Sequence, residues 1–320
     1  MALALPEPEG IKRAGERIAD HAIRSPLVRL AGHGGSGNHI YLKLENLQPG
    51  GSFKIRAGAN ALLALGEDQR KAGVYTASAG NFALGLAIAA QSLDCPIKVF
   101  VPAKAAQNKI EALRSLGAVV EALDFTDWWK ILEDHGRAGE PGHFLHPVAD
   151  QNVLEGNATI GLEIMEDLPG ADCILVPFGG GGLITGIGAA AKSVRPAVRL
   201  IGCESEAATP LAAALKAGHP IEVPYDDETF INGIGCTSVL EIMWPLVREI
   251  VDQAVAVTLE ETAYAVTELV KKNALIAEGA GAVALAAARK MPDRSLNLVA
   301  VISGGNIGLN VIADLLRRYA

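Results

Sequence analysis

The sequence has little positive charge and few aromatic side chains. Its 28 Lys and Arg residues are outnumbered by 36 Asp and Glu residues, and the formal net charge is −8. The basic residues are scattered along the chain, so we expect no nucleic-acid partner. Aromatic residues make up 5% of the chain, whereas glycine occurs 35 times. Small residues at this frequency favour close packing of helices on sheets, as in α/β proteins.

Cysteine is also rare, and long apolar runs are missing. The four cysteines, Cys95, Cys173, Cys203 and Cys236, are far apart and form no Cys-x-x-Cys pair. Their mostly apolar surroundings predict buried, reduced thiols. No run approaches the roughly 18–20 apolar residues of a membrane helix, and the N-terminus lacks the regions of a signal peptide. We therefore expect a cytoplasmic, soluble protein without a membrane partner.

Half of the 320 residues are apolar, which is enough for a large core and predicts two lobes. Short apolar runs alternate with longer helical segments. The predicted strands are 40–44, 74–77, 97–101, 173–178, 199–203 and 298–302. The predicted helices are 55–65, 82–92, 105–115, 156–166, 183–193, 260–272, 279–290 and 307–318. Because such short runs are typical of strands buried on both faces, we predict mainly parallel sheets joined by crossover helices. The polar stretch 124–142 shows no regular pattern.

The first candidate site is a lysine at the head of a helix. Residues 48–56 read Gln-Pro-Gly-Gly-Ser-Phe-Lys-Ile-Arg, and the turn-forming glycines place Lys54 at a helix N-terminus between Phe53 and Ile55. The helix dipole and burial both disfavour an ammonium there, so the pKa of Lys54 should fall. A neutral amine is what a Schiff-base lysine requires. Taken alone, however, Lys54 would be read as an ordinary surface residue.

The second candidate is the tetraglycine turn between an apolar strand and a helix. Gly179, Gly180, Gly181 and Gly182 precede Leu183, and successive backbone amides there can turn inward around a phosphate. A flexible turn is the alternative, although one or two glycines would suffice for it. The one literal G-x-G-x-x-G match, residues 32–37, precedes a predicted strand rather than a helix, so it predicts a hairpin loop and not a dinucleotide site.

Two more polar turns follow predicted strands. Ser78, Ala79, Gly80 and Asn81 end the first of them, where free amides and hydroxyls suit a carboxylate; plain N-capping of the next helix is the alternative. Ser303 directly follows the strand 298–302, at the end where α/β folds place ligands.

Together these motifs resemble the fold-type-II pyridoxal 5′-phosphate (PLP) enzymes, and within them the serine/threonine dehydratase and serine racemase branch. The resemblance extends to Leu-Glu-Asn-Leu at 44–47, Trp-Pro-Leu-Val at 244–247 and Glu-Gly-Ala-Gly at 278–281. It implies two parallel-sheet α/β domains with the cofactor in the cleft between them. The large domain would comprise residues 1–72 and 150–320, and the inserted small domain residues 73–149. A homodimer is also implied.

The resemblance also implies a role for each motif. Lys54 would hold the cofactor and remove the α-proton of the substrate, with Phe53 beside the cofactor ring. Residues 179–183 would bind its phosphate, Asn81 its ring hydroxyl, and residues 78–81 the substrate carboxylate. Ser303 would face the pyridine nitrogen. A neutral hydroxyl cannot stabilise a pyridinium as an aspartate would, so a long-lived carbanion is disfavoured and loss of a β-substituent is favoured.

Several positions depart from the pattern of the branch. Racemases carry a second serine at Ala79 as the opposite base, so we expect elimination rather than racemisation. Phe82 replaces a common histidine, and Trp129 falls near a substrate-side cation of some relatives, so either it lines an aromatic substrate pocket or it only packs on the small domain. Of a metal site known in relatives, Glu204 and Ala208 match, but Pro210 stands for the aspartate, so we expect no metal.

The sequence therefore predicts a lyase, a PLP-dependent ammonia-lyase that converts an L-β-hydroxy-α-amino acid of the serine/threonine class, or a bulkier analogue such as phenylserine, to a 2-oxo acid and ammonia. A cysteine synthase-like β-replacement enzyme and a serine racemase are the alternatives within the fold. A non-catalytic phosphate-binding protein would leave Lys54 and Ser303 unexplained.

Overall fold

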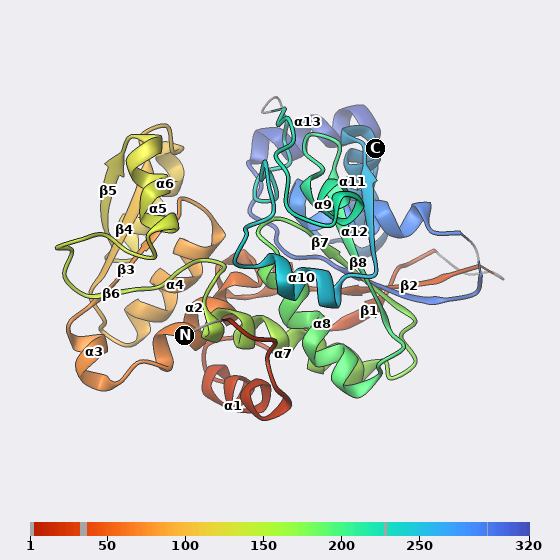
Figure 1. The fold of residues 1–320 in the computed structure, drawn as a ribbon. Coiled ribbons are helices and arrows are strands. Elements are labelled where there is room, and N and C mark those ends of the chain that lie inside the picture. Colours follow the sequence, from red (N-terminus) through yellow and green to blue (C-terminus); the bar gives the residue numbers. More distant parts are fainter. Residues whose placement is uncertain (1–2, 33–36, 227–228, 293) are drawn as a thin grey trace.

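The computed structural model describes residues 3–32, 37–226, 229–292 and 294–320, which form two β-sheets (Figure 1). The six-stranded sheet has the order β1-β2-β10-β7-β8-β9, and the four-stranded sheet has the order β5-β4-β3-β6. The strands of the larger sheet are β1 (Leu27–Arg29), β2 (His39–Lys43), β7 (Cys173–Pro177), β8 (Arg199–Ser205), β9 (Gln253–Val257) and β10 (Asn297–Val301). Those of the smaller sheet are β3 (Val74–Ala77), β4 (Ile97–Pro102), β5 (Val119–Leu123) and β6 (His143–Phe144).

Strand pairing is parallel in both sheets, as predicted, except for the hairpin of β1 and β2. In that hairpin Leu27 pairs with Lys43 and Arg29 with Tyr41. The two paired strands flank the glycine-rich segment 32–37, and the predicted hairpin loop at residues 33–36 lies outside the described residues. Because the other strands run parallel, their carboxyl ends gather at one edge of each sheet.

Helices cover both faces of each sheet. Their bounds are α1 (Pro8–Ile18), α2 (Lys54–Leu63), α3 (Glu67–Lys71), α4 (Asn81–Ser92), α5 (Gln107–Ser115), α6 (Phe125–Glu133), α7 (Gln151–Asp167), α8 (Gly182–Val194), α9 (Pro210–Ala217), α10 (Trp244–Ile250), α11 (Leu259–Asn273), α12 (Gly279–Lys290) and α13 (Leu309–Tyr319), with short 3-10 helices η1 (Glu45–Leu47) and η2 (Pro49–Gly51). Residues of α11, α12 and α13 bury one face of the larger sheet, and residues of α7, α8 and α10 bury the other.

The smaller sheet is covered in the same way. Its β3 and β4 side chains alternate between a core shared with α2 and α4 and a smaller core shared with α6. Val74 and Val99 thus face α2 and α4, whereas Tyr75 and Phe100 face Ile131 of α6. Every residue of β3 is buried, which explains its unbroken apolar run.

One expectation about secondary structure was wrong. The stretch 124–142 was expected to be irregular, but residues Phe125–Glu133 form α6. Its apolar residues recur at helical spacing, and Trp128, Ile131 and Leu132 all pack on the face of the small sheet that carries Tyr75 and Phe100. Aromatic residues and the flanking Asp, His and Gly residues obscured that period.

The division into a large domain and an inserted small domain remains a prediction. The strands of the two sheets fall on either side of the predicted boundaries. Helix α2, however, was assigned to the large domain, and its residues share a core with the small sheet. Limited proteolysis near residues 73 and 149 would test the proposed boundaries. Within the described part of the chain, none of the helices has the length and apolar character needed to cross a membrane.

Candidate active site

Residues from well-separated segments of the chain surround one cavity of about 210 Å³. The predicted site residues that line it are Phe53, Lys54, Ser78, Gly80, Asn81, Gly179, Gly180, Gly181, Gly182, Leu183 and Ser303. They lie at the N-termini of α2, α4 and α8 and at the end of β10. Helix N-termini present unpaired amides, so three of them around one cavity suit an anionic ligand.

Lys54 is the first residue of α2 and points into this cavity. Its Nζ donates to the carbonyl of Pro147 at 3.1 Å and lies 5.1 Å from the ring centre of Phe53 and 5.5 Å from that of Phe82. Desolvation among these groups lowers the pKa of Lys54 to about 8, although the Cys236 thiol opposes the shift. An appreciable fraction of the amine is therefore neutral near physiological pH.

A histidine turn that the sequence did not single out supports this lysine. His146 is buried, and its Nδ1 accepts the amides of Val148 at 3.0 Å and Ala149 at 2.7 Å. Burial, followed by the charges of His135 and Lys54, lowers the pKa of His146 to about 3, so the ring is neutral. Its two bonds fix the turn that presents the Pro147 carbonyl to Lys54.

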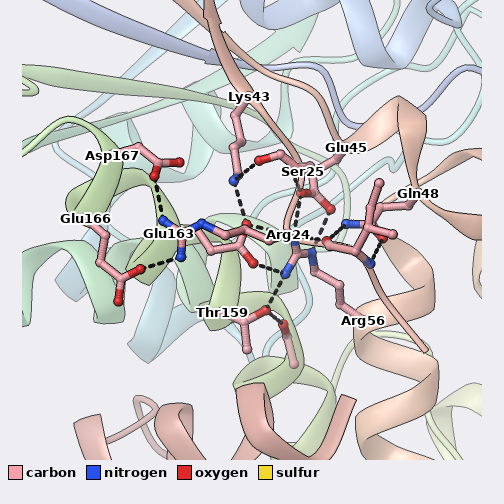
Figure 2. Close-up of polar contacts among 12 residues, drawn as sticks. Arg24, Ser25, Lys43, Glu45, Gln48, Arg56, Thr159, Glu163, Glu166 and Asp167 are labelled. Carbon is pink, nitrogen blue, oxygen red and sulfur yellow. Dashed lines mark hydrogen bonds and ion pairs between the residues drawn. The ribbon is translucent and has the colours of Figure 1, made fainter. Parts of the chain in front are cut away.

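The first turn of α2 is anchored by a buried ionic network (Figure 2). The guanidinium of Arg56 contacts both oxygens of Glu45, at 2.8 and 2.9 Å, and both oxygens of Glu163, at 2.7 and 2.9 Å. Lys43 also bonds Glu163, and Ser25 bonds Glu45. Arg56 lies two residues after Lys54, so the network joins the backbone around Lys54 to η1 and α7.

The tetraglycine turn packs closely against neighbouring residues of the cavity. Gly181 has a φ of +88°, which favours glycine, and it caps α8. A Cβ atom on Gly180 would lie 2.8 Å from the side chain of Val148, and one on Gly179 would lie 3.1 Å from the carbonyl of Gly233. The glycines thus bring backbone amides to the cavity at the head of a 13-residue helix, an arrangement that fits a phosphate.

The turn after β3 contributes a polar edge. Ser78 Oγ accepts the amide of Gly80 at 3.3 Å, and Asn81 begins α4. The side chain of Ala79 packs against the small-sheet core, and Ala79 is not among the residues that line the cavity. Its methyl group cannot exchange a proton in any case.

Ser303 lies at the end of β10, and its side chain is 5% exposed. Its carbonyl accepts the amide of Phe53 at 3.1 Å, and the neighbouring Gly304 forms a β-bridge with Ser52. The strand end and the lysine turn are therefore held against one another. Since Ser303 lines the cavity with a neutral hydroxyl, it matches the partner expected for a pyridine nitrogen.

Other lining residues were missed or only quoted as part of a motif. They are Phe82, Pro147, Val148, Pro177, Gly233, Ile234, Glu278 and Ala280. Burial raises the pKa of Glu278 to about 7, against the opposing effects of Asn81 and Lys109. A glutamate before three small residues at a helix start was the available signal. The loop with Gly233 offers no pattern that points to a cavity.

The structure does not place Trp129 at the cavity. Its indole donates to Glu133 at 2.8 Å and stacks on Phe125, while Trp128 donates to the carbonyl of Phe100. Trp128 packs on the small sheet and Trp129 is partly exposed to solvent, so of the two alternatives this structure favours packing on the small domain over an aromatic substrate pocket. Helical spacing on α6 places Trp128 with Ile131 and Leu132 on the face of the small sheet that carries Tyr75 and Phe100.

Glu204 and the four cysteines have surroundings that account for them structurally. The two oxygens of Glu204 accept the amides of Leu211 at 2.6 Å and Ala212 at 3.0 Å, at the start of α9. Among the described residues, no group of three or more His, Cys, Asp or Glu side chains could hold a metal. Cys95, Cys173 and Cys203 are buried free thiols as predicted, and the free Cys236 is only partly buried.

Comparisons with known proteins identify the family of the chain. Residues 18–304 match the family model described as pyridoxal-phosphate dependent enzyme. The chain is 41% identical to the L-threonine ammonia-lyase of Thermotoga maritima over 290 residues, covering 88% of this chain and 71% of that protein. It is 37% identical to the catabolic L-threonine dehydratase TdcB of Escherichia coli K12 over 286 residues, covering 86% of this chain and 85% of that protein.

Solved structures show the same architecture. Maize serine racemase superposes with a TM-score of 0.86 at 28% identity, covering 99% of this chain and 98% of that chain. The processed threonine deaminase isoform 2 of Solanum lycopersicum superposes with a TM-score of 0.84 at 30% identity, covering 99% of this chain and 96% of that chain. The family match, the fold and the arrangement around Lys54 lead to one conclusion: the chain belongs to the fold-type-II pyridoxal-phosphate dependent enzymes.

Proposed function

We propose that this chain is an L-threonine/L-serine ammonia-lyase, a carbon–oxygen lyase that eliminates water and releases a 2-oxo acid and ammonia. The observation that carries the proposal is the cavity around Lys54, because it combines a desolvated lysine, a glycine turn and a neutral serine in a chain 41% identical to an L-threonine ammonia-lyase. Bound pyridoxal phosphate supplies electron withdrawal, which acidifies the α-carbon of an attached amino acid.

Different residues of the chain bind the cofactor, bind the substrate and transfer the proton. Gly179 to Gly182 and the N-terminus of α8 hold the phosphate through backbone amides. Ser78, Gly80 and the N-terminus of α4 hold the α-carboxylate of the substrate, and this fixes the α-carbon. Lys54 Nζ, neutral in part because its pKa is about 8, accepts the α-proton. Ser303 would place a neutral hydroxyl beside the ring nitrogen of the cofactor without adding charge.

Elimination is favoured over racemisation in this arrangement. Racemisation needs a second proton donor across the α-carbon from Lys54, and the methyl group at Ala79 supplies none. With a neutral partner at Ser303, charge on the α-carbon would be poorly stabilised, so proton removal leads to loss of the β-hydroxyl, which takes the C–O electron pair and one proton and leaves as water. The enamine product then hydrolyses to the 2-oxo acid and ammonia.

The lining residues also favour a small or apolar β-substituent. Phe82, Ile234 and Ala280 are apolar, and of the described residues that line the cavity Lys54 alone is cationic. A second carboxylate on the substrate would therefore lack a partner. L-Threonine and L-serine fit this description, and L-phenylserine tests how far the apolar wall extends.

The test is a substrate panel of L-threonine, L-serine, L-phenylserine and L-threo-3-hydroxyaspartate, scored by release of 2-oxo acid. We expect turnover of L-threonine and L-serine and the lowest rate with 3-hydroxyaspartate. Failure to turn over any of the four would contradict the proposal. Formation of D-serine at a rate comparable to 2-oxo acid would instead identify a racemase, and trapping of the enamine by an added thiol as a main product would identify a β-replacement enzyme.

We also infer that the protein forms a homodimer, from the resemblance to its branch. Light scattering of the purified protein should give twice the mass of one chain, and the mass of a single chain would contradict this inference.

A further inference from the structure

Hydrogen bonds link the side chain of Asn81 to the side chains of Glu278 and Asn306. Asn81 Nδ2 donates to Glu278 Oε1 at 2.8 Å, and Asn81 Oδ1 accepts from Asn306 Nδ2 at 2.9 Å. Asn306 Nδ2 also donates to the carbonyl of Gly50 at 2.7 Å. Glu278 precedes α12 and Asn306 follows β10, so both partners of Asn81 come from the part of the chain that carries the larger sheet.

The donors and acceptors of these hydrogen bonds can be assigned by starting from the carbonyl of Gly50. A backbone carbonyl only accepts, so the nitrogen of Asn306 must face Gly50. The same nitrogen contacts Asn81, which must therefore present its oxygen there and its nitrogen to Glu278. Rotating the Asn81 amide by half a turn would place its oxygen against the carboxyl of Glu278 and its nitrogen against another donor.

Two glycines leave room for the side chains of Glu278 and Asn306. A Cβ atom on Gly304 would lie 2.3 Å from Glu278 Oε1, and one on Gly51 would lie 2.4 Å from Asn306 Oδ1. The backbone amide of Glu278 donates to the carbonyl of Gly304 at 3.0 Å, so backbone and side chain fix the carboxyl together. The geometry is thus built around Glu278, which also lines the cavity.

We propose that Glu278 is a positioning residue that orients the amide of Asn81, so that the second hydrogen of Asn81 Nδ2 is held toward the ring oxygen of the cofactor. An amide nitrogen carries two hydrogens in one plane, so engaging one of them with Glu278 fixes the direction of the other. This inference rests on the proposed function for the contact between Asn81 and the cofactor. It adds a residue for which the sequence suggested no role.

The experiment measures cofactor binding rather than turnover. Glu278→Ala should weaken the affinity for pyridoxal phosphate by about tenfold, the effect of losing one oriented hydrogen bond, and should shift the absorption band of the lysine-bound cofactor. Glu278→Gln retains an acceptor for Asn81 and should restore both properties. Asn306→Ala releases the amide from its other end at an exposed position, so it should act in the same direction even where Glu278→Ala fails to fold.

Glu204→Gln is the matched control, because burial also raises the pKa of the Glu204 carboxyl to about 7, yet that carboxyl binds amides of α9 away from the cavity. It should leave affinity and spectrum unchanged. Wild-type affinity and spectrum in folded Glu278→Ala or in Asn306→Ala would overturn the positioning role alone. Failure of the wild-type protein to bind pyridoxal phosphate would overturn the proposed function instead.

Discussion

At the scale of single residues, the proposed chemistry depends on how Lys54 is kept partly neutral. The lysine has hydrophobic rings beside it and one backbone carbonyl as its acceptor at 3.1 Å. Desolvation is the largest cause of its lowered pKa, and only the Cys236 thiol opposes it. A surface lysine with the same local sequence would remain protonated, so the cavity and not the motif confers the reactivity.

This gives a pH dependence whose sign can be worked out. The pKa of Lys54 is lowered to about 8, so the neutral amine increases as pH rises through 8 and is scarce below it. The rate at which cofactor-free protein takes up pyridoxal phosphate should rise with a midpoint near pH 8 and then level. Free Nα-acetyl-lysine, with a pKa of about 10.4, is the control. A midpoint for the protein near that of the control would show that Lys54 is not desolvated.

The glycine turn and the strand-end polar residues were recognisable at this scale because their residue types have few other uses. Four consecutive glycines and a serine directly after a buried strand point to a ligand. By contrast, Glu278 and His146 were not recognised, because a carboxylate or imidazole in a sequence carries no sign of its partners. Their roles follow only from hydrogen bonds to Asn81 and to the amides after Pro147.

At the scale of elements, the first turn of α2 holds Lys54 in place. Arg56 is 2% exposed and Glu45 is fully buried, so the first turn of α2 carries a buried ionic network with few alternatives to its observed geometry. Glu163, which is 13% exposed, completes the network from α7. The sequence motif included Arg56, but nothing in it identified the two glutamates, which lie 11 and 107 residues away.

Replacing Arg56 should therefore be costly. Arg56→Met leaves Glu45 and Glu163 without their common partner, and removing one partner of a buried ionic group typically lowers the free energy of unfolding by about 3–5 kcal/mol. Urea denaturation of the cofactor-free protein measures this. Arg317→Met, at a pair whose side chains are 73% and 44% exposed, is the control and should change stability by less than about 0.5 kcal/mol. Equal stability of the two variants would contradict the account of the network.

Strands were predicted more accurately than helices that pack on one face only. The runs at β3 and β8 were identified because every residue of β3, and all but the first of β8, is buried. Helix α6 was missed because only Ile131 of it is fully buried. Strand β9 was missed as well; it lies at the edge of the larger sheet, and of its residues Val257 alone is fully buried.

At the scale of the whole molecule, a parallel α/β fold follows from the alternation of short apolar runs and helices, and the comparisons confirm its class. The sequence did not predict which distant segments lie side by side in the folded protein. The residues that line one cavity come from seven stretches of the chain: 53–54, 78 with 80–82, 147–148, 177 with 179–183, 233–234, 278 with 280, and 303. Their convergence depends on strand order and on the crossover helices, which periodicity alone does not determine.

The central claim is that Lys54 carries the cofactor and the elimination. The most direct measurement compares wild-type protein and Lys54→Ala, each incubated with pyridoxal phosphate, by visible absorption and by 2-oxo acid release from L-threonine. Lys71→Ala, at a surface pair whose side chains are 71% and 72% exposed, is the control. We predict a yellow, active wild type and control, and a Lys54→Ala variant that lacks both the band and the activity. A colourless wild type, or an active Lys54→Ala variant, would contradict the account.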